Sequence, residues 1–482
     1  MSKRIIVLSI VLSVLLFGAL YVSLTAFAQD PQITIQCGAN LRPVAELQAD
    51  GAVQVKCKAT VSPTPTPTPT PTPPPTTQPP PSAGKVWDAT PSTLQSLIGK
   101  GSQVKPGDVV RLMPGTYLPP KSQDLPIFRF EVHVAGVTIK GQPGAILDGI
   151  AAKYGALYIA AEGVTVEDVE VTNSLADRGP ERGAGVEVAG SNVTLRRLRV
   201  HDCGNGIFAS ESALSLVIED CLTYNNGWQG PPPDRAHGHG IYAQNANSVK
   251  VIRRNISINN YGAGIHLFGQ RGRVDNFLIE ENIVANNGRT NERQVLIGGQ
   301  EPSQGIRFNR NFVFTPLDAE YQPNVFLGYR PGNLNFEAVG NWFIGGTGVY
   351  VVGWERLKIA DNVIVSKGRA VTFDSPDWRG EWAGNATYSP LVAPFASQGG
   401  LPVQVWPWDE WRANTRESGT FSQGLPVTVQ WAKYENSLAV WNPTARPFVY
   451  AAQIGARKAL DPVTLAEVKE CGAAAFCAVL LR

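Results

Sequence analysis

Short runs in which apolar and polar residues alternate recur along the middle of the chain and predict β-strands. Val164 and Val166 alternate with polar residues, as do Val249 and Val251, which is the periodicity of a strand and not of a helix. One short piece of sequence recurs at 218–227, 252–261 and 279–288. Such repetition is typical of stacked units, each of which buries its apolar face against its neighbours.

Extending the repeat in both directions gives one equivalent marker position in each unit. These positions are Val169, Leu198, Cys221, Asn255, Asn282, Asn311, Asn341 and Asn362. The recurring asparagines predict a ladder of side-chain amides that are hydrogen-bonded along the stack. A second run indicates another corner of the same stack, and it comprises Asp202, Asn225, Asn259 and Asn286.

The two residues before each marker position are charged, and their sign changes from one unit to the next. The pairs are Glu167-Asp168, Arg196-Arg197, Glu219-Asp220, Arg253-Arg254 and Glu280-Glu281. If the units stack as strands about 4.8 Å apart, each acidic pair lies between two basic pairs. We interpret the arginines as members of a salt-bridge ladder; the alternative is a stripe that binds a polyanion.

Composition narrows the class of protein. The chain has 482 residues and a formal net charge of +2, which gives no reason to expect a nucleic-acid partner. Its 48 glycines and 11 tryptophans suit a turn-rich β protein with aromatic surfaces. The six cysteines form no metal-binding pattern, no cofactor motif is evident, and no acidic cluster supports calcium binding.

The N-terminal 28 residues predict export from the cytoplasm. Lys3-Arg4 precedes an apolar run over 5–24, and Ala26-Phe27-Ala28 resembles a cleavage site, so we expect a secretory signal that is cleaved after Ala28. The alternative is an uncleaved membrane anchor through 5–24. Either way, the rest of the chain is predicted to be extracellular, as a secreted or a membrane-tethered protein.

Two short segments follow. Residues 29–61 form a small module in which Ile33, Ile35, Val53 and Val55 predict a hairpin, and its Cys37 and Cys57 are expected to pair. Residues 62–84 form a Pro/Thr-rich linker, which is expected to be extended polyproline II.

The main domain is predicted over 85–400. A short capped helix is expected over 90–98, and Lys105-Pro106-Gly107-Asp108 leads into an apolar strand and then Pro114-Gly115-Thr116-Tyr117. This opening resembles that of the pectin-lyase-like superfamily, as do the repeats up to Asp374. The resemblance implies an all-β fold, a right-handed parallel β-helix with an N-terminal cap helix and three strands per coil.

After the coils, residues 375–400 are expected to form a loop-rich exit. Residues 401–482 predict a small C-terminal β extension that packs on the end of the stack and shields the last coil. Cys471 and Cys477 are close enough in sequence to bridge. Cys203 and Cys221 fall at different corners, and we expect buried thiols there.

Each coil continues into a strand that begins Gly-Ile or Gly-Val, and the residue after the Ile or Val points outward. The outward column that follows comprises Glu187, Phe208, Tyr242 and His266. Since neighbouring members are about 5 Å apart, Tyr242 and His266 are expected to touch.

Extra residues enter the chain at one corner, just before these strands, over 175–184, 227–239 and 288–293. Insertions on one side of a repeat stack commonly build a binding site. The candidate side chains that these loops contribute are Arg178, Arg182, Trp228, Asp234, Arg235, His237, His239 and Arg293.

These residue types suit the cleavage of a uronate polysaccharide by β-elimination. A base removes the proton next to the carboxylate, a cation neutralises that carboxylate, and an acid protonates the leaving oxygen. The histidines are candidate bases, Tyr242 the acid and the arginines the neutralising groups, while Trp228 and Phe208 offer surfaces for sugar rings. Hydrolysis instead needs two carboxylates, which Asp234 and Glu187 could supply.

Other interpretations of these residues, and of the whole protein, stay open. His237 and His239 flank glycines and could make only turn contacts, and the outward rings could be simple surface stacking. Gly238-His239-Gly240 resembles an element of the polygalacturonases, but their aspartate motifs are missing, as is the Arg-x-Pro-x-x-Arg element of calcium-dependent pectate lyases. The sequence therefore predicts a monomeric, secreted protein that cleaves an acidic polysaccharide, with a glycan-binding or adhesion protein built on a rigid rod as the alternative.

Overall fold

The structure is a computed structural model, and it divides into two compact units, Met1–Gln78 and Pro79–Arg482, each described by itself. In the first unit, β1 (Leu41–Leu47) and β2 (Val53–Ala59) pair antiparallel, as a hairpin requires. The predicted signal, the linker up to residue 83 and Cys37 lie outside the described residues. Those residues are 41–47, 53–59, 84–121, 128–150, 155–173, 179, 182–231, 236–270, 272–289, 293–318, 324–373, 380–397 and 404–482.

The second unit is built on three twelve-stranded sheets. Sheet 1 comprises β3 (Val86–Ala89), β4 (Val109–Leu112), β7 (Thr138–Gly141), β10 (Thr165–Glu167), β13 (Thr194–Arg196), β16 (Val217–Glu219), β21 (Lys250–Arg253), β24 (Phe277–Glu280), β27 (Gln304–Asn309), β30 (Asn333–Val339), β33 (Trp354–Ala360) and β36 (Glu381–Ala383). Sheet 2 comprises β5 (Gly115–Tyr117), β8 (Ala145–Asp148), β11 (Glu170–Thr172), β14 (Arg199–His201), β17 (Leu222–Tyr224), β22 (Ile256–Ile258), β25 (Ile283–Ala285), β28 (Phe312–Phe314), β31 (Trp342–Gly345), β34 (Val363–Ser366), β37 (Ala386–Ser389) and β40 (Thr420–Gln423). Sheet 3 comprises β6 (Phe130–Val132), β9 (Gly155–Ile159), β12 (Ala184–Val188), β15 (Ile207–Ala209), β20 (Ile241–Ala243), β23 (Ile265–Leu267), β26 (Val295–Ile297), β29 (Val325–Leu327), β32 (Val349–Val351), β35 (Val371–Phe373), β38 (Phe395–Ser397) and β39 (Gln404–Trp406).

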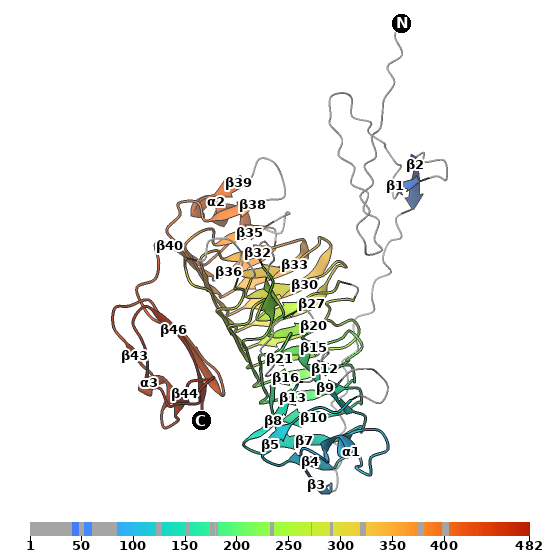
Figure 1. Ribbon diagram of the computed structural model, residues 1–482. Coiled ribbons are helices and arrows are strands. Elements are labelled where there is room, and N and C mark those ends of the chain that lie inside the picture. Colours follow the sequence, from blue (N-terminus) through green and yellow to red (C-terminus); the bar gives the residue numbers. More distant parts are fainter. Residues whose placement is uncertain are drawn as a thin grey trace. The chain divides into compact units, whose positions relative to one another are not determined.

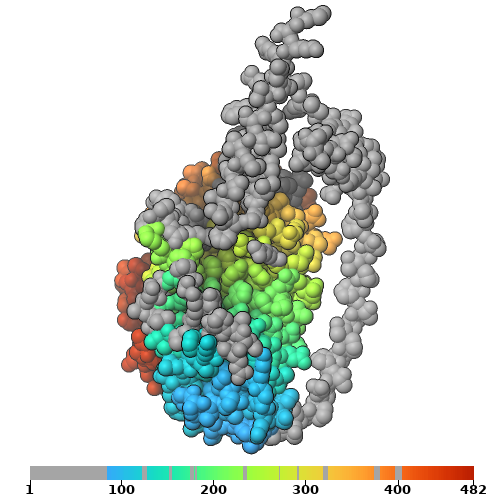
Figure 2. Space-filling model, turned by 45° about the vertical axis from the view of Figure 1, so that its right-hand side comes forward, coloured from blue at the N-terminus to red at the C-terminus, as the bar shows by residue number. Residues whose placement is uncertain are grey.

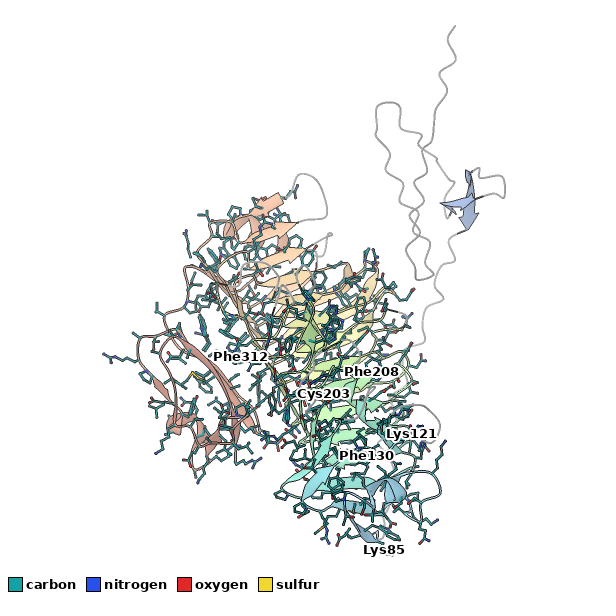
Figure 3. The ribbon with its side chains drawn as sticks, in the orientation of Figure 1. Lys85, Lys121, Phe130, Cys203, Phe208 and Phe312 are labelled. Carbon is teal, nitrogen blue, oxygen red and sulfur yellow. A yellow bond between two sulfur atoms is a disulfide. The ribbon has the colours of Figure 1, made fainter. Side chains whose placement is uncertain are left out.

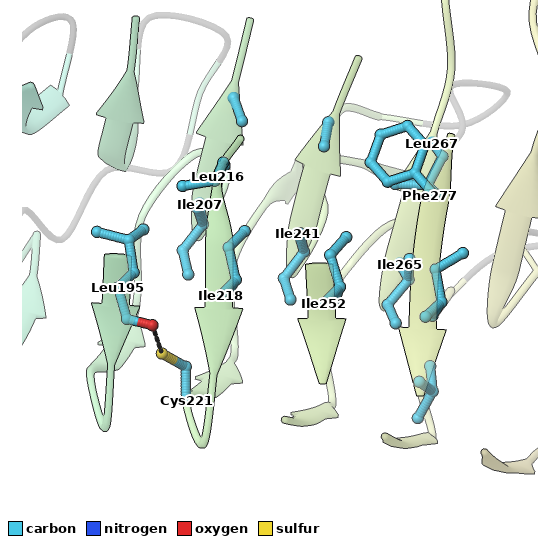
Figure 4. Close-up of a cluster of buried hydrophobic side chains, with 14 of the residues drawn as sticks. Leu195, Ile207, Leu216, Ile218, Cys221, Ile241, Ile252, Ile265, Leu267 and Phe277 are labelled. Carbon is cyan, nitrogen blue, oxygen red and sulfur yellow. Dashed lines mark hydrogen bonds between the residues drawn. The ribbon is translucent and has the colours of Figure 1, made fainter. Parts of the chain in front are cut away.

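Each coil visits sheet 1, sheet 2 and sheet 3 in turn, and its strands pair in parallel with those of the coils before and after it (Figure 1). The colours in the space-filling view accordingly change in order along the rod (Figure 2). Inward-pointing residues such as Ile207, Ile241 and Ile265 are completely buried, and they stack on one another between the sheets (Figure 4). The predicted parallel β-helix is confirmed.

The asparagine ladder lies at the corner between sheets 1 and 2. The Nδ2 and backbone N–H groups of Asn255 both donate to Oδ1 of Asn282, at 2.9 and 3.0 Å, and Asn282 makes the same two bonds to Asn311. The ladder continues to Asn385, where the Glu417 carboxylate accepts the last bonds. Nδ2 of Asn255 also donates to the Ile218 carbonyl oxygen, and Nδ2 of Asn282 to that of Ile252, both in the coil before and both at 2.9 Å. The neighbouring coils on both sides thus satisfy each buried amide, which is the reason the residue recurs.

The predicted second corner is confirmed, and a second ladder of amides that was not predicted lies beside it. Asn225, Asn259 and Asn286, like Asp202, adopt left-handed backbone conformations that turn the corner between sheets 2 and 3. The buried amides are those of the next residues, Asn226, Asn260 and Asn287, and Gln294 closes the row.

The alternating charges pair across coils as predicted. Glu219 is almost completely buried between two arginines: Arg196 Nε lies 2.6 Å from one carboxylate oxygen, and Arg253 Nη2 lies 2.6 Å from the other. Burial alone would raise the pKa of Glu219, but the hydrogen bonds from the two arginines outweigh it and lower that pKa. This ladder is therefore structural.

Both ends of the rod are covered. At the N-terminal end, α1 (Leu94–Ile98) buries Leu94 and Ile98, although its N-cap residue, Thr93, makes no side-chain capping bond, contrary to the expected capped helix. At the other end, β39 and α2 (Trp408–Thr415) cover the last coil, and Trp411 stacks on Phe395 with ring centroids 4.5 Å apart.

The segment expected to be a loop-rich exit is another coil. β36, β37 and β38 each pair in parallel with the preceding coil, and Asn385 joins the ladder. The prediction was wrong here because the marker asparagine of this coil falls beyond the range in which the repeat was recognised.

The C-terminal extension packs along the side of the rod, on the outer face of sheet 2, rather than only on its end. Its strands are β41 (Gln430–Lys433), β42 (Ser437–Asn442), β44 (Ala459–Leu460) and β46 (Ala475–Leu481) in one sheet, with β43 (Phe448–Val449) paired to β45 (Glu470–Cys471) and α3 (Ala451–Ile454) between them. Tyr434 and Trp441 pack against Ile283 and Phe312 in one buried cluster. Phe312 is labelled in Figure 3.

The cysteines behave as expected where the structure describes them. Cys471 and Cys477 form a disulfide within the extension. Cys203 and Cys221 are buried thiols at different corners, and Sγ of Cys221 donates to the carbonyl oxygen of Leu195 (Figure 4).

Candidate functional site

The three outer faces of the rod differ in what they can bind. Sheet 2 is covered by the extension, and the outer face of sheet 1 carries the paired charges. Sheet 3 bears a line of aromatic and titratable side chains on its outer face, and a short hairpin directly precedes one of its strands in the sequence. Chemistry on a polymer is therefore best placed on sheet 3.

The predicted column is present in this order on adjacent strands. Glu187 is the register partner of Phe208, Phe208 of Tyr242, and Tyr242 of His266. The Phe208 and Tyr242 rings meet edge to face at 5.2 Å, and the Tyr242 and His266 rings at 5.0 Å. The same column continues in both directions, through Tyr158 and Glu131 on one side and through Leu296, Phe326 and Tyr350 on the other.

Two of the predicted histidines lie together at the centre of this column. The His239 and His266 rings are stacked with centroids 3.8 Å apart and planes 12° apart, and His239 also meets Tyr242 edge to face at 5.6 Å. Their proximity depends on the corner loop, because β20 begins only at Ile241 and His239 precedes it. The sequence predicted the Tyr242 contact but not the histidine stack.

The corner fixes the His239 ring and its tautomer. The backbone N–H of Ala263 donates to His239 Nδ1 at 2.9 Å, and the backbone N–H of His239 donates to Asn205 Oδ1 at 2.9 Å. A ring whose Nδ1 accepts a hydrogen bond carries its proton on Nε2 when neutral. Gly262 makes room for the ring, since a β-carbon there would lie 2.6 Å from Nδ1.

His237 and Trp228 form the short hairpin beside the column. They are register partners in β18 (Trp228–Gln229) and β19 (Ala236–His237), and their rings stack at 4.2 Å. His237 is therefore placed against Trp228 and not in the stacked histidine pair. Asp234 and Arg235, which belong to the same loop, lie outside the described residues.

Tyr242 is suited to remain protonated. Burial raises the pKa of its phenol, although a hydrogen bond with the Gln244 side chain partly opposes the shift. A tyrosine that holds its proton through the neutral range can donate it to a developing alkoxide.

Of the four arginines predicted to bind substrate, Arg182 and Arg293 lie within the described residues, and their surroundings differ. Arg293 lies on the outer face, with its guanidinium 4.7 Å from the centre of the Phe326 ring. Arg182 is buried and donates to the carbonyl oxygens of Asn173 and Asp202, so it braces the corner, and the structure offers no surface on which it would meet a polymer. Arg178 lies outside the described residues.

A charged cluster at the N-terminal end of the column was missed. Arg129 Nε donates to Glu131 at 2.8 Å, its guanidinium lies 3.8 Å over the Tyr158 ring, and its Nη1 lies 3.8 Å from Glu187 Oε2. Burial raises the pKa of the Glu187 carboxyl, and the Arg129 charge opposes that shift. Both Phe130-Glu131-Val132 and Val186-Glu187-Val188 place a glutamate between two apolar residues. This shared pattern is the signal that could have revealed the charged cluster.

Other candidate sites are weaker. A cavity of about 660 Å³ lies between the rod and the extension, but most of its charged side chains pair with one another or with close neighbours, as Arg197 does with Asp168 at 2.6 Å. Within the described ranges, no group of three or more His, Cys, Asp or Glu side chains is arranged to hold a metal ion. None of the helices in those ranges has the length and hydropathy to cross a membrane.

Comparisons with known proteins agree with the fold. Residues 131–313 match the family described as the right-handed β-helix region. No curated protein matches the sequence. Similar solved structures include pectate lyase Pel9A, with 15% identity, a TM-score of 0.37, and coverage of 71% of this chain and 78% of that one.

Two further similar structures are the A-module of the Azotobacter vinelandii mannuronan C-5 epimerase AlgE6 and an alginate lyase from Paenibacillus sp. str. FPU-7. The epimerase module has 14% identity, a TM-score of 0.40, and coverage of 71% of this chain and 96% of that one. The lyase has 16% identity, a TM-score of 0.34, and coverage of 71% and 98%. At this level of similarity, a function has to be argued from the side chains of sheet 3.

Proposed function

We propose that this right-handed parallel β-helix protein cleaves an acidic polysaccharide by β-elimination on the outer face of sheet 3. The observation that supports this most is the stacked pair of His239 and His266, held edge-on to Tyr242 on an aromatic face with Arg293 beside it. A base, an acid and a cation are thus gathered within a few strands of one another.

The length and lining of the face favour a polymer over a small molecule. From Phe208 to Tyr350 the column crosses six adjacent strands, a span of about 24 Å at the usual spacing of parallel strands, and every member of it except the buried Leu296 is partly exposed. Aromatic side chains present flat apolar surfaces, which pack well against the faces of sugar rings. A chain of several sugars could therefore lie along the rod.

In the elimination step, a histidine takes the proton from C5 of a uronate, next to its carboxylate. The C–H electron pair becomes the C4–C5 double bond, the C4–O bond breaks, and the leaving oxygen takes a proton from Tyr242. The products are an unsaturated uronate end and a new reducing end, and no water is consumed. Arg293 stabilises the charge that develops on the carboxylate.

The geometry of the stacked histidines favours different roles for the two rings. The Nδ1 atom of His239 accepts the Ala263 N–H, so its Nε2–H is a donor toward the substrate carboxylate. Nδ1 of His266 is buried, which leaves Nε2 as the nitrogen that can take the proton. Two imidazolium rings 3.8 Å apart would repel each other, so a neutral His266 beside His239 is the favoured base.

Hydrolysis is less well supported. Its predicted pair, Glu187 and Asp234, includes a residue outside the described ranges. The other described carboxylate in the column, Glu131, is separated from Glu187 by the Arg129 guanidinium. A hydrolase needs the space between its two carboxylates for the glycosidic bond and, in inverting enzymes, for water.

The proposal is tested with purified protein and a panel of uronate polymers. Rising ultraviolet absorbance from unsaturated ends is expected, and His266→Ala should lower the rate by a factor of about 10² to 10⁴, the usual contribution of a general base. His201→Gln, on the covered sheet 2, is the matched control and should keep the wild-type rate.

If new reducing ends form without a rise in ultraviolet absorbance, the protein cleaves the polymer by hydrolysis and not by elimination. Wild-type protein that turns over no polymer would contradict catalysis and leave the glycan-binding alternative. Export belongs to the same proposal, and a mature protein that begins at Gln29 by N-terminal sequencing would support a cleaved signal over a membrane anchor.

A further inference from the structure

The two ends of the sheet 3 column carry different charges. On the N-terminal side of the histidine pair, the column contains two carboxylates, those of Glu131 and Glu187, with one guanidinium between them. On the C-terminal side, the column contains Leu296, Phe326 and Tyr350, and the charged group stacked on it is Arg293.

At the N-terminal end, the Arg129 guanidinium is engaged chiefly with one of the two acids, Glu131, whose Oε2 also lies 3.5 Å from Nε2 of His133. Arg129 Nε donates to Glu131 at 2.8 Å while the guanidinium lies on the Tyr158 ring. Its Nη1 lies 3.8 Å from Glu187 Oε2, which is outside hydrogen-bonding distance. Glu187 therefore presents a carboxyl group to the face, and its side chain is 30% exposed.

At the C-terminal end, guanidinium groups stack on aromatic rings. Besides Arg293 on Phe326, Arg330 lies 5.7 Å from the centre of the Tyr329 ring, and its Nε and Nη2 both donate to Gln300 Oε1, at 3.2 and 3.1 Å. The stacked guanidinium of Arg293 places a positive charge at this end of the column, which suits a carboxylate.

We infer that the substrate is a polymer of mixed charge, with its uronate on the C-terminal side of the histidine pair and an uncharged or amino sugar opposite Glu187. This rests on the proposed function. Glu187 is three strand spacings from His266, about 14 Å, which is a distance of a few sugars along the chain.

A polymer with a carboxylate on every sugar would bring a negative charge close to Glu187. Like charges at contact distance near a protein surface repel with an energy that is comparable to the differences between good and poor substrates. A hydroxyl, the N–H of an N-acetyl group or an ammonium group would instead donate a hydrogen bond to the Glu187 carboxylate. The face thus discriminates by charge at a position away from the bond that breaks.

The test compares hyaluronan, in which glucuronate and N-acetylhexosamine alternate, with polygalacturonate, in which every sugar is a uronate. The wild-type protein should have a kcat/KM for hyaluronan about tenfold higher. Glu187→Gln should reduce that ratio about fivefold by improving polygalacturonate. Glu355→Gln, an exposed glutamate on sheet 1, is the matched control. The ratio should also shrink at high salt.

Equal rates on both polymers, or a ratio that Glu187→Gln leaves unchanged, would overturn the inference. If neither polymer yields unsaturated ends, elimination fails, and calorimetric titration of the wild-type protein with both polymers decides the charge preference separately. Tighter binding of hyaluronan would support the mixed polymer; tighter binding of polygalacturonate, or no binding of either, would overturn it.

Discussion

The outer faces of sheets 2 and 3 are built on the same coils yet meet different surroundings. Sheet 2 presents Ile283, Phe312 and other apolar side chains, and the C-terminal extension buries them. Sheet 3 presents half-buried rings, two stacked histidines and charged groups, and no described part of the extension is packed on it. The backbone of a β-helix therefore does not decide which face is functional; the outward side chains do.

The largest expected contrast is in stability. Phe312 is completely buried against the extension, so Phe312→Ala should lower the free energy of unfolding by about 3–5 kcal/mol. Phe208→Ala, on sheet 3, should cost less than about 1 kcal/mol, because the ring is only partly buried. Chemical unfolding of the two variants measures both, and equal losses would mean that sheet 3 is a covered face as well.

The next contrast is in catalysis. Tyr242→Phe removes the proposed acid and should lower the rate of elimination about 10²-fold, with little change in stability. Tyr388→Phe, on sheet 2, should leave that rate unchanged. The initial rates of ultraviolet absorbance compare the pair, and a fully active Tyr242→Phe would remove this tyrosine from the mechanism.

A smaller contrast concerns two arginines. Arg293→Gln should raise KM for an acidic polymer about tenfold, the effect of losing one charge-assisted contact. Arg199→Gln, whose Nη2 donates to the Val463 carbonyl oxygen of the extension, should change stability and not KM. If Arg199→Gln raised KM and Arg293→Gln did not, the polymer would bind on sheet 2 and not on sheet 3.

The smallest expected effect is on the pH dependence of stability, and it involves His201 on sheet 2. Burial would lower the pKa of His201, but hydrogen bonds to Asp202 and Glu170 outweigh it and raise that pKa. Its stabilising effect should therefore be fully present below the unfolded value of 6.5 and be lost as the pH rises through the folded pKa. Unfolding free energies of wild type and His201→Gln across this range should converge at alkaline pH; parallel curves would contradict the assignment.

The sequence predicted the repeating features best and missed most of those that join segments with no common period. The Asn255–Asn282 ladder, the Glu219–Arg253 pair and the Tyr242–His266 contact follow from stacking equivalent positions one coil apart, and all three are confirmed. The docking of the extension on sheet 2 joins segments with no common period. A sequence pattern could not show which outer face Trp441 would cover.

The candidate site was predictable only in part for the same reason. The outward column followed from the strand pattern, but the stacking of His239 on His266 depends on how a non-repeating corner loop turns. Arg182 lies in a similar loop and proved to be buried. Loop side chains lack the constraint that parallel pairing imposes on strand residues.

The measurement that tests the central claim most directly is the histidine ring signal in nuclear magnetic resonance spectra of the Tyr242→Phe variant, titrated with hyaluronan oligosaccharides. The chain has five histidines, and His201 lies on sheet 2, away from the stacked pair of His239 and His266 on sheet 3. We expect the signals of His239 and His266 to shift while that of His201 stays in place. A shift of His201 with no change at His239 and His266 would contradict the account.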